Sequence, residues 1–333
     1  MTCRVAAVDC GTNSLRLLVA DVDRDRAELT DLTRRMEIVR LGEGVDQTGR
    51  LSPAALARTI EVLRAYADII AGFAAQSVRM VATSATRDAG NAAEFVRRVT
   101  EVLGVPPEVL TGAQEAMLSF TGATAELAAD HGGPFLVADI GGGSTEFVLG
   151  PGPGGTGGGQ PPVTRGGLGG IVPPDYSAIS VNIGCVRMTE RHLRGDPPTA
   201  RQVEAATADI DAALDAVADA VPVPAAKTLV GLAGSVTTVA AIAMGLPAYD
   251  AARIHHARIC SADVHAVTSA LLSQTRRARA GIGVMHPGRV DVIGGGALVL
   301  DRVMDRFGFS EVLVSEHDIL DGIAWSLARD SCG

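Results

Sequence analysis

The sequence predicts an α/β protein made of two similar units, each a sheet with helices packed against it. The first observation is a motif that occurs near the start of the chain and again from residue 135, an apolar stretch, a glycine-containing turn and a second apolar stretch. The two copies align with one constant offset of 130 positions at Asp9, Gly11 and Ser14 in the first copy and Asp139, Gly141 and Ser144 in the second. The second observation is that strands and helices follow each copy in the same order. A tandem duplication of one α/β unit explains both.

In the first unit, the motif predicts a pair of strands over residues 5–19, and residues 28–40 predict a third strand. Ser52 and Pro53 form a helix start, an N-cap followed by proline at the first helical position, and apolar residues recur at helical spacing as far as Ile70. Further strands are predicted over residues 77–82 and 107–110, and further helices over residues 87–103 and 112–129. The predicted order is therefore βββαβαβα.

The second unit repeats this order. The predicted strands cover residues 135–138, 147–149, 178–184, 228–232 and 311–314, and the predicted helices cover residues 199–220, 295–307 and 317–328, with one more helix from Gly234. Residues 150–170 interrupt this order with 11 glycines and 4 prolines among 21 residues. Such a segment cannot bury enough apolar surface to offset the entropy lost on ordering, so it predicts a flexible loop.

Length and composition are those of a globular protein with room for two cores. The chain has 333 residues, of which 47% are hydrophobic and 20% are charged. No stretch of about 18 uninterrupted apolar residues occurs, and the chain starts without the pattern of a signal peptide. We therefore expect a cytoplasmic protein with no membrane partner.

Charge and cysteine content exclude several classes of protein. The net charge of −9 argues against nucleic-acid binding, although basic residues gathered at one site could still bind a polyanion. All but one of the 29 basic residues are arginine, whose forked guanidinium suits phosphate oxygens. The five cysteines are widely spaced and form no CxxC pair, so we expect neither a disulfide nor a structural zinc site.

Each glycine turn is suited to binding a phosphate. Glycines let the backbone approach an anion closely, the N–H groups of the turn form an anion-binding concavity, and Ser144 and Thr145 add hydroxyl groups. The carboxylates of Asp139 and Glu146 would repel a phosphate, so they predict a cation such as Mg²⁺ at this turn. The alternative is an ordinary glycine-rich hairpin. The duplication favours the phosphate site.

Six segments of the chain, in this order, resemble the exopolyphosphatase/guanosine pentaphosphate phosphohydrolase (Ppx/GppA) family. They are residues 9–14, 40–44, 82–87, 111–116, 139–146 and 231–235. The likeness spans nearly the whole chain and is to the short form of the family, which lacks additional C-terminal helical regions. Any one of these motifs would be weak, whereas six in the right order are specific.

The resemblance implies a fold and a domain organisation. The family has the ribonuclease H-like fold of actin, sugar kinases and the Hsp70 ATPase, which agrees with the duplication. We therefore expect two ribonuclease H-like domains with a cleft between them. The first would comprise residues 1–125 and a C-terminal helix, residues 315–333, that packs back on it, and the second would comprise residues 126–314 with the loop 150–170.

The resemblance also implies roles for individual residues. Glu115 would be the catalytic base that orients or deprotonates the attacking water. Asp139 and Glu146 would bind Mg²⁺, and Asp9 would either bind the metal or brace its hairpin. The residues expected to bind phosphate are Thr12, Asn13, Ser14, Arg87, Gly141, Gly142, Gly143, Ser144, Thr145, Gly234 and Ser235.

For three of these assignments, a role without function is the alternative. Glu115 could be a solvated helix carboxylate. Arg87 is predicted to start a helix, where its guanidinium and the helix N-terminus would bind one anion together, and it could equally be an exposed arginine with no partner. The turn at Gly234 and Ser235 meets adenosine in nucleotide-binding relatives, and here it could hold a nucleotide, further phosphates of a chain, or nothing.

The function implied by the resemblance is Mg²⁺-dependent release of the terminal phosphate from inorganic polyphosphate, with short chains as substrate and a homodimer as the assembly. The first alternative is a guanosine pentaphosphate 5′-phosphohydrolase. The second is a non-catalytic sensor of guanosine tetraphosphate in the stringent response. A sugar kinase or actin-like ATPase would share the fold, but the sequence has no signature of an acceptor-binding region.

Overall fold

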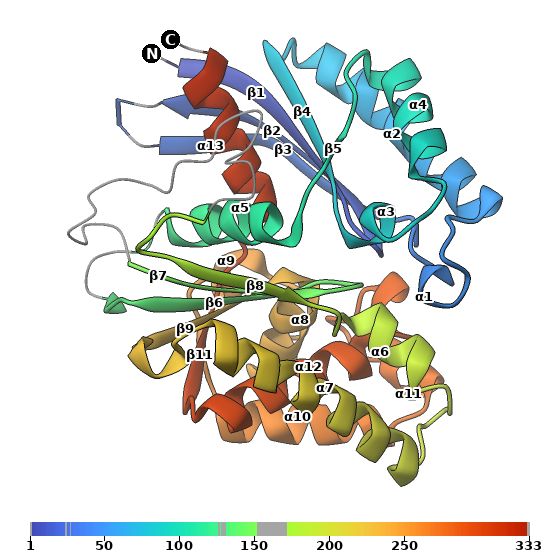
Figure 1. Cartoon of the computed structure of the whole chain (residues 1–333), viewed down its shortest axis with the longest axis vertical. Coiled ribbons are helices and arrows are strands. Elements are labelled where there is room, and N and C mark those ends of the chain that lie inside the picture. Colours follow the sequence, from blue (N-terminus) through green and yellow to red (C-terminus); the bar gives the residue numbers. More distant parts are fainter. Residues whose placement is uncertain are drawn as a thin grey trace. The chain divides into compact units, whose positions relative to one another are not determined.

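The computed structural model describes residues 2–23, 25–26, 28–125, 127, 131–151 and 172–331. These residues form two compact units. Unit 1 holds the described residues up to Gly122, together with Val172 and those from Asp318 onward, and unit 2 holds the rest. Figure 1 shows that each unit contains its own sheet with helices around it. The predicted bounds of 1–125, 126–314 and 315–333, and the cleft, stay predictions.

Unit 1 is built on a five-stranded sheet of order β3-β2-β1-β4-β5. The strands are β1 (Thr2–Cys10), β2 (Ser14–Asp23), β3 (Glu28–Ile38), β4 (Ser77–Ala82) and β5 (Glu108–Val109). The helices are α1 (Val45–Thr48), α2 (Pro53–Gly72), α3 (Ser84–Arg87), α4 (Ala92–Leu103), α5 (Gly112–Thr124) and α13 (Ile319–Ser331). The first three strands are antiparallel neighbours, and β4 and β5 add to the sheet in parallel.

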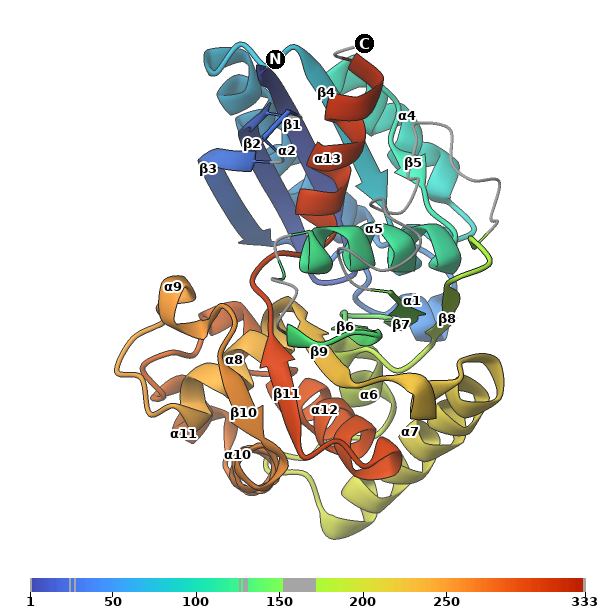
Figure 2. The same cartoon turned by 90° about the vertical axis from the view of Figure 1, so that its left-hand side faces the viewer.

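Helices cover both faces of this sheet, α2 and α4 on one face and α13 on the other (Figures 1 and 2). Alternation along β1 decides which side chain faces which layer, because successive residues of a strand point to opposite faces. Val8 belongs to the core shared with α2 and α4. Asp9 therefore points to the face that α13 covers, and its partner across the strand pair, Arg16, points the same way.

Two glycines allow α5 and α13 to cross at very short distance. A Cβ added to Gly122 would lie 1.8 Å from the carbonyl oxygen of Asp318, and one added to Gly322 would lie 2.1 Å from that of Leu118. Any side chain at either position would therefore force the two helices apart.

Unit 2 is built on a six-stranded sheet of order β10-β11-β9-β6-β7-β8. The strands are β6 (Phe135–Ile140), β7 (Thr145–Gly150), β8 (Ser177–Val181), β9 (Thr228–Leu232), β10 (Arg258–Cys260) and β11 (Glu311–Val314). The α-helices are α6 (Cys185–Arg191), α7 (Ala200–Ala220), α8 (Ala233–Ala243), α9 (Ala251–Ile254), α10 (Ser261–Ser273), α11 (Arg276–Ala280) and α12 (Ile293–Phe307). Helix α12 packs on α6, α7, α8 and α10, so it lies at the centre of the helical layer.

The prediction of two α/β units is confirmed, and the strands predicted over residues 77–82, 228–232 and 311–314 have the predicted bounds. The predicted helix over residues 87–103 is wrong at its start, because α4 begins only at Ala92. Arg87 is the last residue of the four-residue helix α3 instead. Gly90 lies between α3 and α4 and donates its N–H to the carbonyl of Gly49. This N–H therefore cannot form the hydrogen bond of a continuous helix.

Two further expectations concern the cysteines and the glycine-rich segment 150–170. Cys3 is disulfide-bonded, contrary to the prediction, whereas Cys10, Cys185 and Cys260 are free. Separation along the chain does not prevent a disulfide, because folding brings distant residues together. The predicted flexible loop begins within β7, and its residues 152–170 lie outside the described part of the chain.

Candidate active site

The second hairpin, formed by β6, β7 and the turn between them, presents backbone N–H groups in a row. Gly141 closes the turn by donating to the carbonyl of Ser144 at 3.1 Å. Among the residues that the structure describes, no acceptor is found for the N–H groups of Gly142, Gly143 and Ser144. Unpaired, adjacent N–H groups in a turn are the usual backbone site for an anion.

A second segment of unit 2 closes over this turn. The chain after β8 donates from the N–H groups of Cys185 and Val186 to the carbonyls of Gly141 and Gly142, both at 2.9 Å. A Cβ at Gly184 would come within 2.3 Å of the carbonyl carbon and oxygen of Gly142, so only glycine permits this approach. The turn is therefore held by the backbone of this segment and by the side chain of Arg187, whose Nε donates to the carbonyl of Gly143 at 2.7 Å.

The acidic pair of unit 2 lies on one face of the sheet. Asp139 and Glu146 are directly opposite each other in the antiparallel register of β6 and β7, so their side chains point to the same side. Both are buried, and Oε1 of Glu146 accepts a hydrogen bond of 2.7 Å from the hydroxyl of Ser180 on β8. Two buried carboxylates on one face repel each other unless a cation or a proton compensates them.

Ser144 and Thr145, the other predicted phosphate ligands of this turn, differ in whether their hydroxyl groups have a partner in the protein. Ser144 is buried, and its hydroxyl has no partner within the described residues. Thr145 is also buried, and its hydroxyl donates to the carbonyl of Ile183 at 2.9 Å, which stabilises the fold. Ser144 is therefore the stronger candidate for a phosphate ligand.

The first hairpin, formed by β1, β2 and the turn between them, has the same backbone plan. Gly11 donates to the carbonyl of Ser14 at 3.0 Å, as Gly141 does in the second hairpin. The carbonyls of Thr12 and Asn13 accept from the N–H groups of residues 39, 40 and 42, at 2.8 to 3.0 Å. No acceptor is found for the N–H groups of Thr12 and Asn13 among the residues described.

The side chains of the first hairpin differ from those of the second. The hydroxyl of Thr12 is 2.9 Å from that of Ser84 at the start of α3. Arg16 stands opposite Asp9, where the second hairpin has Glu146, and it donates to Oδ2 of Asp9 from Nε at 3.0 Å and from Nη2 at 2.7 Å. Burial raises the pKa of Asp9, and the Arg16 guanidinium opposes that rise.

Glu115 lies in the first turn of α5, which begins with a capping box. Thr111 accepts from the N–H of Gln114, and the side-chain oxygen of Gln114 accepts from the N–H of Thr111. Glu115 itself is buried, and its Oε2 pairs with Nη1 of Arg87 at 3.0 Å. It is therefore no solvated carboxylate, and its role as a base stays a prediction.

Arg87 differs from the expectation in its position. It ends α3 and does not start a helix, so no helix N-terminus assists it in binding an anion. Its Nη1 donates to the carbonyl of Leu110 at 2.9 Å as well as to Glu115. These two contacts place its guanidinium beside the predicted base.

The turn at the start of α8 contains an arginine that the sequence did not indicate. The guanidinium of Arg289 lies against Gly234, since a Cβ there would be 2.1 Å from Nη2. Nη1 of Arg289 also donates to the hydroxyl of Thr238 at 3.3 Å. The side chain of Ser235 packs against Gly296 of α12 and bonds the thiol of Cys185, so its hydroxyl faces the protein interior.

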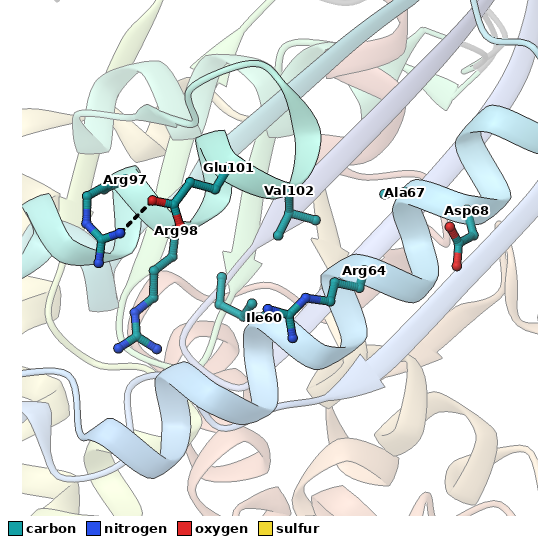
Figure 3. Close-up of a pocket in the computed structure, with 8 residues that line it drawn as sticks. All are labelled: Ile60, Arg64, Ala67, Asp68, Arg97, Arg98, Glu101 and Val102. Atoms are coloured by element: carbon teal, nitrogen blue, oxygen red, sulfur yellow. Dashed lines mark hydrogen bonds and ion pairs between the residues drawn. The ribbon is translucent and has the colours of Figure 1, made fainter.

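A pocket of unit 1 lies away from the predicted site residues. It has a volume of about 680 Å³ and lies between α2 and α4, as Figure 3 shows. Arg97 and Arg98 on its rim are paired with Glu101 and Glu94, and no predicted site residue lines it. We therefore assign no chemistry to this pocket.

The comparisons with known proteins agree with one another. The sequence profile of the Ppx/GppA phosphatase family matches residues 18–330. Exopolyphosphatase 2 of Mycobacterium tuberculosis is 48% identical over 336 residues, and the match covers 98% of each chain. The chain belongs to the Ppx/GppA phosphatase family.

Solved structures extend this result to the fold. An exopolyphosphatase-like protein has a TM-score of 0.90 at 40% identity, over 100% of this chain and 99% of that one. The Ppx/GppA family member of Aquifex aeolicus has a TM-score of 0.78 at 29% identity, over the whole of both chains. The predicted fold class, two ribonuclease H-like domains, is therefore confirmed. Among the described helices, none is both long and apolar enough to cross a bilayer.

Within each unit, the structure places further residues beside the predicted site residues that the family motifs do not contain. Ser180, Asp318 and Arg289 contact predicted site residues or their partners, yet none of them stands in a glycine motif. The only signal that could have found one of them is the register of the sheet, which places Ser180 opposite Glu146.

The donors present fit a divalent metal ion. In unit 2, Asp139 and Glu146 offer hard oxygen ligands on one face of the sheet. In unit 1, taken by itself, Oδ1 of Asp9 is a buried carboxylate oxygen without a hydrogen-bond partner in the described structure. Oxygen donors of this kind are what Mg²⁺ prefers. Within the described residues, no group of three His, Cys, Asp or Glu side chains is arranged as a complete metal site, so substrate or water would have to supply the remaining ligands.

Proposed function

We propose that this protein is an exopolyphosphatase, which hydrolyses the terminal phosphoanhydride bond of inorganic polyphosphate and releases orthophosphate with Mg²⁺ as cofactor. The observation that carries the proposal is the second hairpin, where three unpaired N–H groups stand next to two carboxylates on one face of the sheet. N–H groups would bind the phosphate oxygens, and the two carboxylates would hold the cation that accompanies a polyphosphate. The relative in Mycobacterium tuberculosis is named for this activity.

The chemistry needs positioning and charge compensation more than covalent catalysis. The N–H groups of Gly142 and Gly143, with the Ser144 hydroxyl, hold non-bridging oxygens, and the first hairpin offers Thr12 and Asn13 for other phosphates of the chain. Asp139 and Glu146 would hold Mg²⁺, which when bound neutralises charge on the phosphate oxygens and the leaving group.

Glu115 would orient the attacking water and accept its proton. Its partner Arg87 holds one carboxylate oxygen, Oε2, at 3.0 Å. This contact restricts the orientation of the carboxylate. The negative charge of Glu115 is balanced by Arg87 before the substrate, itself an anion, arrives.

The finer features of the function belong to the same proposal. The substrate is short-chain polyphosphate, since the chain resembles the short form of the family. Guanosine tetraphosphate would compete for the phosphate sites, and guanosine pentaphosphate is the competing substrate because its terminal phosphate is also joined by an anhydride. A homodimer and a cytoplasmic location complete the proposal.

Phosphate release from four substrates tests the proposal. Purified protein would be given short polyphosphate, long polyphosphate, guanosine pentaphosphate and ATP, each with and without Mg²⁺. We expect Mg²⁺-dependent orthophosphate release that is fastest with short polyphosphate. Faster release from guanosine pentaphosphate would select the phosphohydrolase instead, and tight binding of guanosine tetraphosphate with no release from any substrate would select a sensor.

Replacing the base tests the mechanism. Glu115→Gln keeps the size and the hydrogen-bonding capacity of the side chain, and it removes the ability to accept a proton. We expect kcat for polyphosphate to fall about 10²–10⁴-fold with little change in KM. Glu101→Gln, an exposed carboxylate on α4 that also pairs with an arginine, is the matched control. A Glu115→Gln enzyme with the wild-type rate would remove Glu115 from the mechanism.

A further inference from the structure

A chain of charged groups in unit 1 connects the first hairpin to the last helix. Arg16 donates to Oδ2 of Asp9 from two nitrogens, at 3.0 and 2.7 Å, and its third nitrogen, Nη1, donates to Oδ2 of Asp318. Asp318 immediately precedes α13, 302 residues away in the sequence. All three nitrogens of the guanidinium thus donate to these two carboxylates.

Asp318 is itself held in place by the helix that follows it. Its Oδ1 accepts from the N–H of Leu320 at 3.0 Å, and its own N–H donates to Oδ2 of Asp321 at 2.9 Å. These are contacts of a helix start, in which side-chain oxygens satisfy backbone N–H groups and N–H groups of the first turn find acceptors. The side chain of Asp318 therefore cannot swing away from Arg16 without breaking the start of α13.

At the other end of this chain of contacts, one carboxylate oxygen of Asp9 has no hydrogen-bond partner among the described residues. Oδ1 of Asp9 is buried and has no hydrogen-bond partner among the described residues, although Oδ2 has two. The side chain of Asp9 is only 3% exposed. A buried carboxylate oxygen without a partner costs about 1–3 kcal/mol, so a ligand that satisfies it is favoured.

The charges of the group point to a cation as that ligand. Two carboxylates, Asp9 and Asp318, share one guanidinium, which leaves one negative charge in a largely buried place. An anion cannot relieve this excess, whereas a divalent cation at Oδ1 can. The Arg16 fork determines which oxygen remains open to it.

We propose that Arg16 is a positioning residue that fixes the Asp9 carboxylate with Oδ1 open to a divalent cation, and that Asp318 holds Arg16 in place. The proposal rests on the metal dependence in the proposed function. It assigns α13 a part in the site, because the start of this helix sets the position of Arg16.

Positioning and simple electrostatics predict opposite results when Arg16 is changed. Removing a positive charge next to a cation site raises cation affinity by Coulomb attraction. Removing a group that orients a metal ligand lowers cation affinity, typically about 10–100-fold. Arg16→Met therefore separates the two effects by sign. Arg16→Lys keeps the charge but loses the two-nitrogen grip on Oδ2, so positioning alone predicts weaker binding.

Arg34 offers a matched control within the same unit. It pairs with Asp321 in the first turn of α13, as Arg16 pairs with Asp318, and its Nη2 is 2.6 Å from Oδ1 of Asp321. No contact joins Arg34 to Asp9 in the described structure. Arg34→Lys therefore loosens the attachment of α13 without touching the Asp9 carboxylate.

The experiment measures binding of Mn²⁺ to the substrate-free protein by calorimetry and by the electron paramagnetic resonance signal of free Mn²⁺. We expect Arg16→Lys and Arg16→Met to weaken Mn²⁺ binding about tenfold, Asp9→Asn to weaken it at least as much, and Arg34→Lys to leave it within twofold of wild type. Thermal unfolding of each variant shows that it is folded, and Arg16→Lys carries the test if Arg16→Met does not fold.

Several outcomes would overturn the inference. Unchanged or tighter Mn²⁺ binding by the Arg16 variants would remove the positioning role, and so would wild-type binding by Asp9→Asn or no Mn²⁺ uptake by the wild type. Equal weakening in Arg34→Lys would show that only the packing of α13 matters. The proposed function fails separately, through an absence of phosphate release by the wild-type enzyme, so the two failures are distinguishable.

Discussion

The first and second hairpins share a backbone and differ in charge at one cross-strand position. Both turns close with the same hydrogen bond, from Gly11 to Ser14 and from Gly141 to Ser144. Across from the shared aspartate, the first hairpin has an arginine and the second has a glutamate, at positions 16 and 146. The same backbone arrangement therefore occurs in two different electrostatic environments.

The difference shows how one backbone can perform two tasks. In the first hairpin the aspartate is paired within the protein, through a guanidinium that two carboxylates share. In the second hairpin a second carboxylate replaces that guanidinium, and the neighbour on β8 is the hydroxyl of Ser180. The second hairpin consequently offers two carboxylates as cation ligands, whereas the first offers one. The backbone N–H groups remain suited to phosphate in both.

The largest effect is expected from the residue that differs. Glu146→Gln removes one of the two carboxylates from the second hairpin at constant volume. We expect the rate of Mg²⁺-dependent phosphate release at a fixed, subsaturating Mg²⁺ concentration to fall about a thousandfold, since charge compensation by a metal contributes several kcal/mol.

Excess Mg²⁺ sharpens this test. Partial recovery of the Glu146→Gln rate at high Mg²⁺ would place the defect in metal binding, as we expect. A rate that neither falls at low Mg²⁺ nor responds to its concentration would contradict the division of tasks between the two hairpins.

Gly184 and Gly42 each pack against one of the two turns, so the tolerance of the two turns to an added methyl group can be compared. A Cβ at Gly184 would meet the backbone carbonyl of Gly142 at 2.3 Å, and a Cβ at Gly42 would meet the side-chain methyl carbon Cγ2 of Thr12 at 2.4 Å. Backbone in a closed turn cannot move aside, whereas a side chain can move partway. We expect Gly184→Ala to lower the free energy of unfolding by about 3 kcal/mol and Gly42→Ala by about 1 kcal/mol.

Urea unfolding followed by circular dichroism measures both variants. Gly72→Ala is the control, because a Cβ there would meet no heavy atom within 4 Å. Equal destabilisation by Gly42→Ala and Gly184→Ala would mean that the packing against the two turns is equally rigid. The two hairpins would then differ only in charge.

Local signals in the sequence predicted much of the fold for a physical reason. Ser52 accepts from the N–H of Ala55 at the start of α2, and the glycine turns form where the strand pairs end. Such features depend on neighbouring residues alone. Short elements with weak periodicity were missed, among them α9 and α11, because four or five residues do not establish a helical pattern.

The contacts that complete the site could not be predicted in the same way. Arg16 and Asp318 are 302 residues apart, and Arg289 reaches Thr238 from 51 residues away. Such pairs form only once the sheets and helices are packed, and no local pattern encodes them. The break at Gly90 likewise arises from a hydrogen bond to Gly49, outside the segment that was predicted as one helix.

The smallest effect is expected from the hydroxyl beside the second hairpin. Ser180→Ala removes the donor that holds Oε1 of Glu146 at 2.7 Å and leaves both carboxylates in place. Partners that orient a metal ligand contribute about tenfold in metal affinity, so the Mg²⁺ concentration for half-maximal activity should rise about tenfold with kcat nearly unchanged. Ser144→Ala, which removes a proposed phosphate ligand, should raise KM for polyphosphate and leave the Mg²⁺ requirement as it is. If Ser180→Ala changed the KM for polyphosphate and not the Mg²⁺ requirement, Glu146 would be acting on the substrate and not on the metal.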